Sequence, residues 1–203
     1  MSSIVISGDT SGSVSVTVPA VAGTNTVTIP AVTGTAVIAG QNSAITASTA
    51  QASTSGTSID FTGIPSWVKR ITVMFNGVST NGSSVIQVQL GTGGTPTTSG
   101  YTSMTSYIAT TNNTTRASTI TSGFGTQFTG GSASTILYTA TLTFTLLSSN
   151  IWTCSGNAFD SVDPGLITVV GSIGLAGTLN MVRITTVNGT DTFDAGSINI
   201  LYE

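Results

Sequence analysis

The sequence predicts an all-β protein in which a short N-terminal β-repeat precedes a C-terminal antiparallel β-sandwich or jelly roll. Sixty-eight of the 203 residues are Ser or Thr, only eleven are charged, and the helix formers Lys and Glu occur once each. The apolar positions are rich in Val and Ile, and β-branched side chains suit a pleated, half-buried surface. Composition and patterning therefore both favour strands over helices.

The first 40 residues contain an internal repeat of short strands. Val16–Thr24 reads Val-Thr-Val-Pro-Ala-Val-Ala-Gly-Thr, and Val27–Thr35 repeats its Pro, Ala, Val, Gly and Thr in register after 11 residues. Each unit predicts an alternating strand, a proline that blocks one ladder position, and a glycine-containing turn. Isolated strands of this kind are marginal in water. We therefore expect residues 1–40 to intertwine with other copies of the chain; the alternative is a disordered low-complexity tail.

The remainder divides by composition into a linker and one larger domain. Residues 41–58 lose the alternation and are rich in Ser, Thr, Ala and Gln, which is typical of a linker. From 59 to 203, turn-rich stretches separate about eight alternating segments, which predicts a sandwich of antiparallel strands. The expected strands lie at 67–75, 86–90, 102–109, 137–147, 151–154, 166–171, 179–186 and 197–202.

Two of these strands carry specific predictions about which side chains face the core. In 137–147, Tyr138, Leu142 and Phe144 alternate with threonines, so we expect the apolar residues to point inward and the threonines outward. In 86–90 the aliphatic residues are expected to point inward, and Gln87 and Gln89 outward.

The charge pattern and the rare residue types exclude several classes of protein. The net charge is −3, and Lys69-Arg70 is the only pair of adjacent basic residues, so no basic stripe predicts a nucleic-acid partner. The sequence contains no run of 18 apolar residues, so we do not expect it to insert into a membrane as a helix. The chain has no histidine and one cysteine, Cys154, which excludes histidine-dependent catalysis and zinc or iron sites. We expect Cys154 to be a buried thiol, and the protein to be non-enzymatic and to need no cofactor.

Three stretches resemble a known class of protein. The opening Ser-Gly-Asp-Thr-Ser-Gly-Ser-Val at 7–14, with the repeat that follows it, is similar to the start of many bacteriophage tail-fibre and other virion appendage proteins. The stretch 60–73, Asp-Phe-Thr-Gly-Ile-Pro-Ser-Trp-Val-Lys-Arg-Ile-Thr-Val, resembles a β-domain of such proteins, as does the end of the chain at 194–203.

The resemblance implies a homotrimeric fibre on the surface of a phage virion. Its N-terminal part would attach to other tail or capsid proteins, and its C-terminal domain would contact a host cell-surface glycan or protein. The chain lacks the extended shaft of a long tail fibre, so a capsid-mounted head fibre or decoration protein is an alternative. A small β-sandwich lectin or adhesin is another.

The candidate receptor-binding residues lie in and beside the polar loop Thr110–Ser118. Asn112, Asn113 and Arg116 supply amides and a guanidinium, and Tyr107 supplies an aromatic ring, which together suit sugar or carboxylate recognition. Arg116 is the only charged residue between Arg70 and Asp160. Alternatively, these aromatic residues belong to the sandwich core and Arg116 keeps the loop soluble.

Two pairs of aspartates are weak candidates for binding a cation. Asp160 and Asp163 form one pair, and Asp191 and Asp194 form the other. Neither segment matches a twelve-residue calcium loop, and Asp, Asn, Pro and Gly are the residues that turns use. We therefore expect turns at both places and no metal site, and a catalytic carboxylate pair is less favoured still.

Overall fold

The computed structural model describes residues 3–7, 13–17, 45–110, 115–127 and 134–203. The chain forms two compact units, Met1–Ala36 and Val37–Glu203. In the first unit, β1 (Ser3–Ser7) and β2 (Ser13–Thr17) pair as an antiparallel hairpin with Ser3 opposite Thr17. The strand β2 includes the start of the first repeat, whereas the second repeat lies outside the described residues.

The larger sheet of the second unit contains nine antiparallel strands among the described residues. Their order is β10-β9-β14-β13-β12-β6-β16-β3, and β4 pairs with β16 as well. The bounds are β3 (Thr46–Ala47), β4 (Gln51–Ala52), β6 (Arg70–Thr80), β9 (Thr102–Ala109), β10 (Thr115–Ile120), β12 (Tyr138–Ser148), β13 (Ile151–Asp160), β14 (Gly165–Gly174) and β16 (Phe193–Tyr202).

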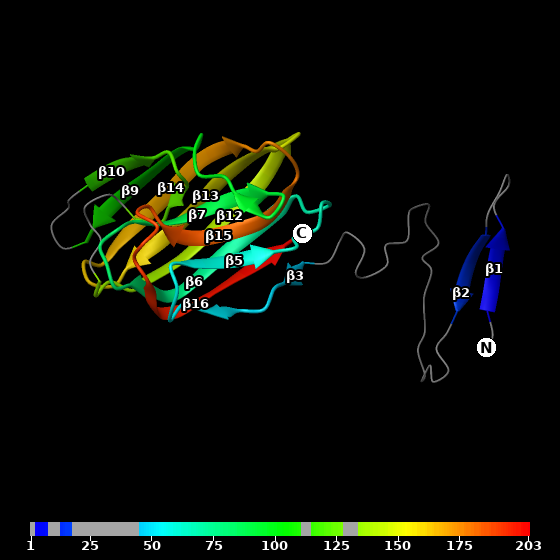
Figure 1. The fold of residues 1–203 in the computed structure, drawn as a ribbon, viewed down its shortest axis with the longest axis horizontal. Helices are drawn as coiled ribbons and strands as arrows, with labels where there is room; N and C mark the ends of the chain where they lie inside the picture. Colours follow the sequence, from blue (N-terminus) through cyan, green and yellow to red (C-terminus); the bar gives the residue numbers. More distant parts are fainter. Residues whose placement is uncertain (1–2, 8–12, 18–44, 111–114, 128–133) are drawn as a thin grey trace. The chain divides into compact units, whose positions relative to one another are not determined.

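The smaller sheet contains five strands among the described residues, in the order β11-β7-β15-β5 with β8 paired to β7. The bounds are β5 (Ser58–Thr62), β7 (Ile86–Thr92), β8 (Thr95–Pro96), β11 (Phe124–Gly125) and β15 (Leu179–Thr186). Figure 1 shows β5, β7 and β15 lying over strands of the larger sheet.

One hydrophobic core joins the two sheets. Val73, Leu142 and Phe144 of the larger sheet and Val88 and Ile184 of the smaller sheet are all fully buried members of it. The part of the chain that the structure describes contains no helix, and none of it is a helical segment long and apolar enough to cross a membrane. The prediction of an all-β protein is confirmed, and the two antiparallel sheets are consistent with a β-sandwich.

Strand β12 has the predicted alternation. Tyr138, Leu142 and Phe144 are buried, whereas Thr139 and Thr141 on the opposite face are exposed. β12 pairs with β13 on one side and with β6 on the other, so both edges of its backbone are hydrogen-bonded within the sheet. The alternation of its side chains then determines which face is buried and which is exposed to solvent.

The segment 41–58 differs from the linker that its composition predicts. Within its described part, β3 pairs with the end of β16 and β4 pairs with its middle. Ser53 is fully buried, and its hydroxyl donates a hydrogen bond of 2.7 Å to the carbonyl oxygen of Ala195. The C-terminal strand would otherwise be the edge of the larger sheet, and this polar segment pairs with that edge.

Gln87 and Gln89 on β7 are buried, so their predicted outward solvation is wrong. Both amides are bonded to Ser122, just before β11, which pairs with β7. The Ser122 hydroxyl donates to Gln87 Oε1 at 2.8 Å, and Gln89 Nε2 donates to the carbonyl oxygen of Ser122 at 2.9 Å. Buried amides are stable here because these hydrogen bonds replace those to water.

Candidate functional site

The predicted receptor loop is shorter than the sequence suggested. Residues 115–120 form β10, an edge strand of the larger sheet, so Arg116 lies on a strand and not in a loop. Its side chain is exposed, and it stands opposite Tyr107 of β9 in the register. Asn112 and Asn113 lie outside the described residues.

Tyr107 belongs to the core and not to a surface site. Only 1% of the residue is exposed, and its hydroxyl donates a hydrogen bond of 2.5 Å to the carbonyl oxygen of Asp163. A buried ring cannot stack on an external sugar. Of the candidate residues that are described, Arg116 alone therefore offers a functional group to a partner from this end of the sheet.

The carboxylate of Asp160 stabilises the turn between β13 and β14. The residue is buried, and its Oδ1 atom accepts hydrogen bonds from the backbone N–H groups of Val162 at 2.9 Å and Asp163 at 3.2 Å. This is the local side chain-to-backbone pattern that aspartate provides in turns. Asp163 contributes its carbonyl to Tyr107, as described above.

Asp191 bonds to two turns, and Asp194 joins β16 to β6. Asp191 Oδ2 accepts from the backbone N–H of Ser84 at 2.8 Å, and Oδ1 accepts from the Asn188 amide at 2.6 Å. Asp194 accepts a hydrogen bond from the Ser79 hydroxyl. Within the described ranges, no three His, Cys, Asp or Glu side chains gather in a way that could hold a metal ion.

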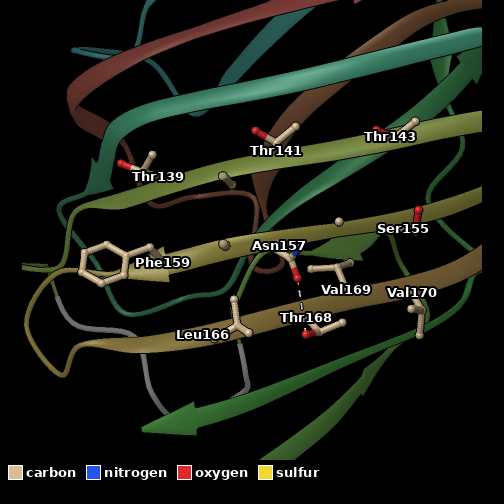
Figure 2. A pocket seen from close by; sticks show the side chains of 13 residues that line it. Thr139, Thr141, Thr143, Ser155, Asn157, Phe159, Leu166, Thr168, Val169 and Val170 are labelled. Atoms are coloured by element: carbon tan, nitrogen blue, oxygen red, sulfur yellow. Dashed lines mark hydrogen bonds between the residues drawn. The ribbon is translucent and has the colours of Figure 1, made fainter. Parts of the chain in front are cut away.

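A shallow concave surface lies on the solvent face of the larger sheet. A shallow groove of about 680 Å³ crosses β12, β13 and β14, and its lining side chains are shown in Figure 2. The residues that line it are Thr139, Ala140, Thr141, Thr143, Ser155, Gly156, Asn157, Ala158, Phe159, Leu166, Thr168, Val169 and Val170. Most of these side chains are short, so the sheet surface is hollowed between the larger ones.

The pairing of the three strands arranges the groove in cross-strand rows. Thr141 on β12 stands opposite Asn157 on β13, and Asn157 stands opposite Thr168 on β14. The Thr168 hydroxyl donates to Asn157 Oδ1 at 3.5 Å (Figure 2). The next row towards the β13–β14 turn joins Phe159 to Leu166. The groove thus has a polar row of hydroxyl and amide groups beside an apolar row.

The groove contains no charged residue and no nucleophile beside a base. Its polar atoms are threonine and serine hydroxyls, one side-chain amide and the backbone. Such a surface can form neutral hydrogen bonds and apolar contacts, and it therefore suits an uncharged ligand or an uncharged protein surface. The alternation in 137–147 predicted the outward threonines, but the groove depends on neighbouring strands and was not predicted.

Comparisons of this chain with protein-family models, with curated proteins and with solved structures found no match.

Proposed function

We propose that this chain is a structural, non-enzymatic subunit of a bacteriophage virion, a tail fibre that takes part in attachment to the host surface. One observation carries the proposal: an all-β domain exposes a broad sheet face of hydroxyl and apolar groups, in a chain with only eleven charged residues of 203. Such a surface suits recognition and assembly rather than chemistry. The sequence resemblance to virion appendage proteins supplies the particular class.

Within this proposal the two units have different roles. Residues 1–40 hold three copies together and attach them to other tail or capsid proteins, because their repeated, nearly uncharged strands need partner surfaces. The C-terminal domain faces the host. We place its contact with a host glycan or protein at the end of the larger sheet that carries Arg116, where an exposed guanidinium can bond to a carboxylate or phosphate.

A second candidate function, a lectin or adhesin, is favoured by the groove itself. The row of Thr141, Asn157 and Thr168 offers hydroxyl and amide groups, and the exposed ring of Phe159 lies in the next row. Neutral sugars are bound by such combinations of hydrogen-bonding groups and an apolar surface. A capsid-mounted head fibre or decoration protein shares the structural role and differs in the site of attachment.

The proposal is tested by asking whether the chain co-purifies with virus particles. Particles from cells that produce the chain are separated on a density gradient, and the chain is detected by mass spectrometry in each fraction. We expect it in the particle fraction, together with the capsid proteins. If it stays among the free proteins, the virion proposal is wrong.

A further inference from the structure

The solvent face of the larger sheet carries several large apolar side chains at positions where an ordinary solvated face would be polar. An antiparallel sheet with one face in water normally alternates apolar side chains inward with polar ones outward. Here five large apolar side chains point outward from three neighbouring strands and are between 42% and 53% exposed. They are Met104 and Ile108 on β9, Leu166 and Val170 on β14, and Phe159 on β13.

These side chains are contiguous across the strands. Phe159 stands opposite Leu166, and Leu166 stands opposite Ile108, so the three form one row across the sheet. Four residues further along the strands, Val170 stands opposite Met104, and Thr168 opposite Ser106 lies between the two apolar rows. Adjacent strands are about 4.8 Å apart, so neighbours within a row are in contact range, and the polar row of Asn157 and Thr168 lies between the two apolar rows. We call the solvent face of β9, β14, β13 and β12 the outer face.

Charged side chains lie at the borders of the outer face and not in its groove. Arg70 stands opposite Thr145 of β12 and is paired with Glu203, and Arg116 lies on β10 beside β9. The groove that occupies much of the outer face is lined only by uncharged residues. Two copies can therefore pack groove to groove without burying a charged side chain at the centre of the contact.

The area of the outer face lies at the lower end of the range for a stable contact between subunits. Four strands of about ten residues, at about 3.3 Å per residue and about 4.8 Å between strands, cover roughly 600 Å² before side-chain relief is counted. A standard stable interface buries about 800 Å² per partner, and solvent-exposed apolar patches of several hundred Å² commonly mark such interfaces.

We propose that copies of this chain pack against one another through the outer face of β9, β14, β13 and β12. The inference rests on the proposed self-assembly. It adds a contact between copies in the C-terminal domain to the contact proposed for residues 1–40. The apolar rows supply most of the contact area, and the threonine and asparagine row between them supplies hydrogen bonds.

The test compares the accessibility of engineered thiols in the full chain. Leu166→Cys places a thiol in the middle of the outer face, and Val187→Cys, at a residue 47% exposed in the turn after β15, is the matched control. The wild-type chain gives the background, because its single thiol at Cys154 is buried. In the assembled protein we expect Leu166→Cys to be labelled about tenfold or more slowly than Val187→Cys, since only the dissociated fraction reacts.

A charge on the outer face supplies the second arm of the test. Adding Val170→Asp to Leu166→Cys should restore the control labelling rate, whereas adding Val187→Asp should not, and circular dichroism checks that each variant is folded. The oligomeric mass is measured by light scattering at the same concentrations. Slow labelling that dilution and Val170→Asp both relieve supports the proposal.

Each other outcome overturns the proposal in a distinguishable way. Equal labelling rates in an oligomer would show that residues outside this face hold the copies together and that the face is open to a glycan or another protein. In that case the proposed trimer stands and the outer-face contact does not. A monomer would remove both. Slow labelling that persists in a monomer would show that the chain itself covers the face.

Discussion

The ring of Phe124 on the smaller sheet lies 5.2 Å, centroid to centroid, from the ring of Phe144 on the larger sheet. Phe124 also makes an edge-to-face contact with Tyr101 at 5.0 Å. Both phenylalanines are fully buried, so this contact ties the two layers together at the centre of the domain. Aromatic pairs in this range contribute beyond the area that they bury.

Replacing Phe144 should therefore destabilise the domain strongly. We expect Phe144→Ala to lower the free energy of unfolding by about 3–5 kcal/mol, because it removes a large buried side chain and leaves a cavity. Val187→Ala, at an exposed residue in the turn after β15 and away from the outer face, should change it by less than about 0.5 kcal/mol. Urea unfolding of the two variants measures both. Similar losses would show that Phe144 contributes no more to the stability of the domain than a surface residue does.

The two-bond ion pair between Arg183 and Asp60 should add modestly to the free energy of unfolding, and its contribution should depend on salt. Arg183 Nε donates to Asp60 Oδ1 at 2.7 Å, and Nη2 donates to Oδ2 at 2.6 Å, between paired positions of β15 and β5. Lysine cannot form both bonds, so we expect Arg183→Lys to lower the free energy of unfolding by about 0.5–1 kcal/mol at low salt. The difference should shrink at high salt; a loss independent of salt would contradict an electrostatic role.

The buried thiol and tyrosine hydroxyls should make the domain less stable at high pH. Burial raises the pKa of the Cys154 thiol and of the Tyr101 and Tyr138 hydroxyls. The folded state therefore binds these protons more tightly, and the resulting stability is complete below the unfolded-state pKa values and lost as the pH rises above them. Those values are about 8.5 for cysteine and about 10 for tyrosine.

The contribution of the thiol can be separated with one variant. The free energy of unfolding of the wild-type chain should begin to fall near pH 8.5, whereas that of Cys154→Ala should begin to fall only near about pH 10. Urea unfolding across this range provides the comparison. Identical pH profiles would mean that the folded thiol titrates as an exposed one does.

The predicted receptor end of the domain can be tested on host cells. If the exposed Arg116 contacts a carboxylate or phosphate of a surface polymer, Arg116→Ala should reduce binding of the purified chain about tenfold, in line with the loss of a charge-assisted pair. Asn113→Ala tests the neighbouring part of the sequence, and Val187→Ala is a surface control. Unchanged binding by all folded variants would place the receptor contact elsewhere.

The sequence predicted the burial of a side chain correctly where that burial depends only on the residue's own strand. The alternation in 137–147 assigned Tyr138, Leu142 and Phe144 to the core because a strand's two faces follow directly from the period of two. The turns that contain Asp160 and Asn188 could be predicted for a similar reason, since Asp and Asn side chains accept hydrogen bonds from backbone N–H groups two or three residues further along.

It was a poor guide wherever burial depends on a distant segment. Gln87 is polar, and its position on β7 predicted exposure to solvent. It is instead bonded to Ser122, and the sequence around Gln87 does not predict that contact. The sequence predicted Tyr107 as a receptor-binding residue, but its ring is in the core and its hydroxyl donates to the carbonyl oxygen of Asp163. The apolar patch is equally non-local, because Ile108 and Leu166 become neighbours only when β9 pairs with β14.

The proposed role as a virion appendage is tested most directly by electron microscopy of purified particles labelled with a gold-tagged antibody against this chain. The particles are those released by cells that produce the chain, and a non-binding antibody serves as the control. We predict gold at fixed positions on the particle surface, at the tail for a tail fibre or over the capsid for a head fibre. Intact particles that bind no more antibody than the control would contradict the account.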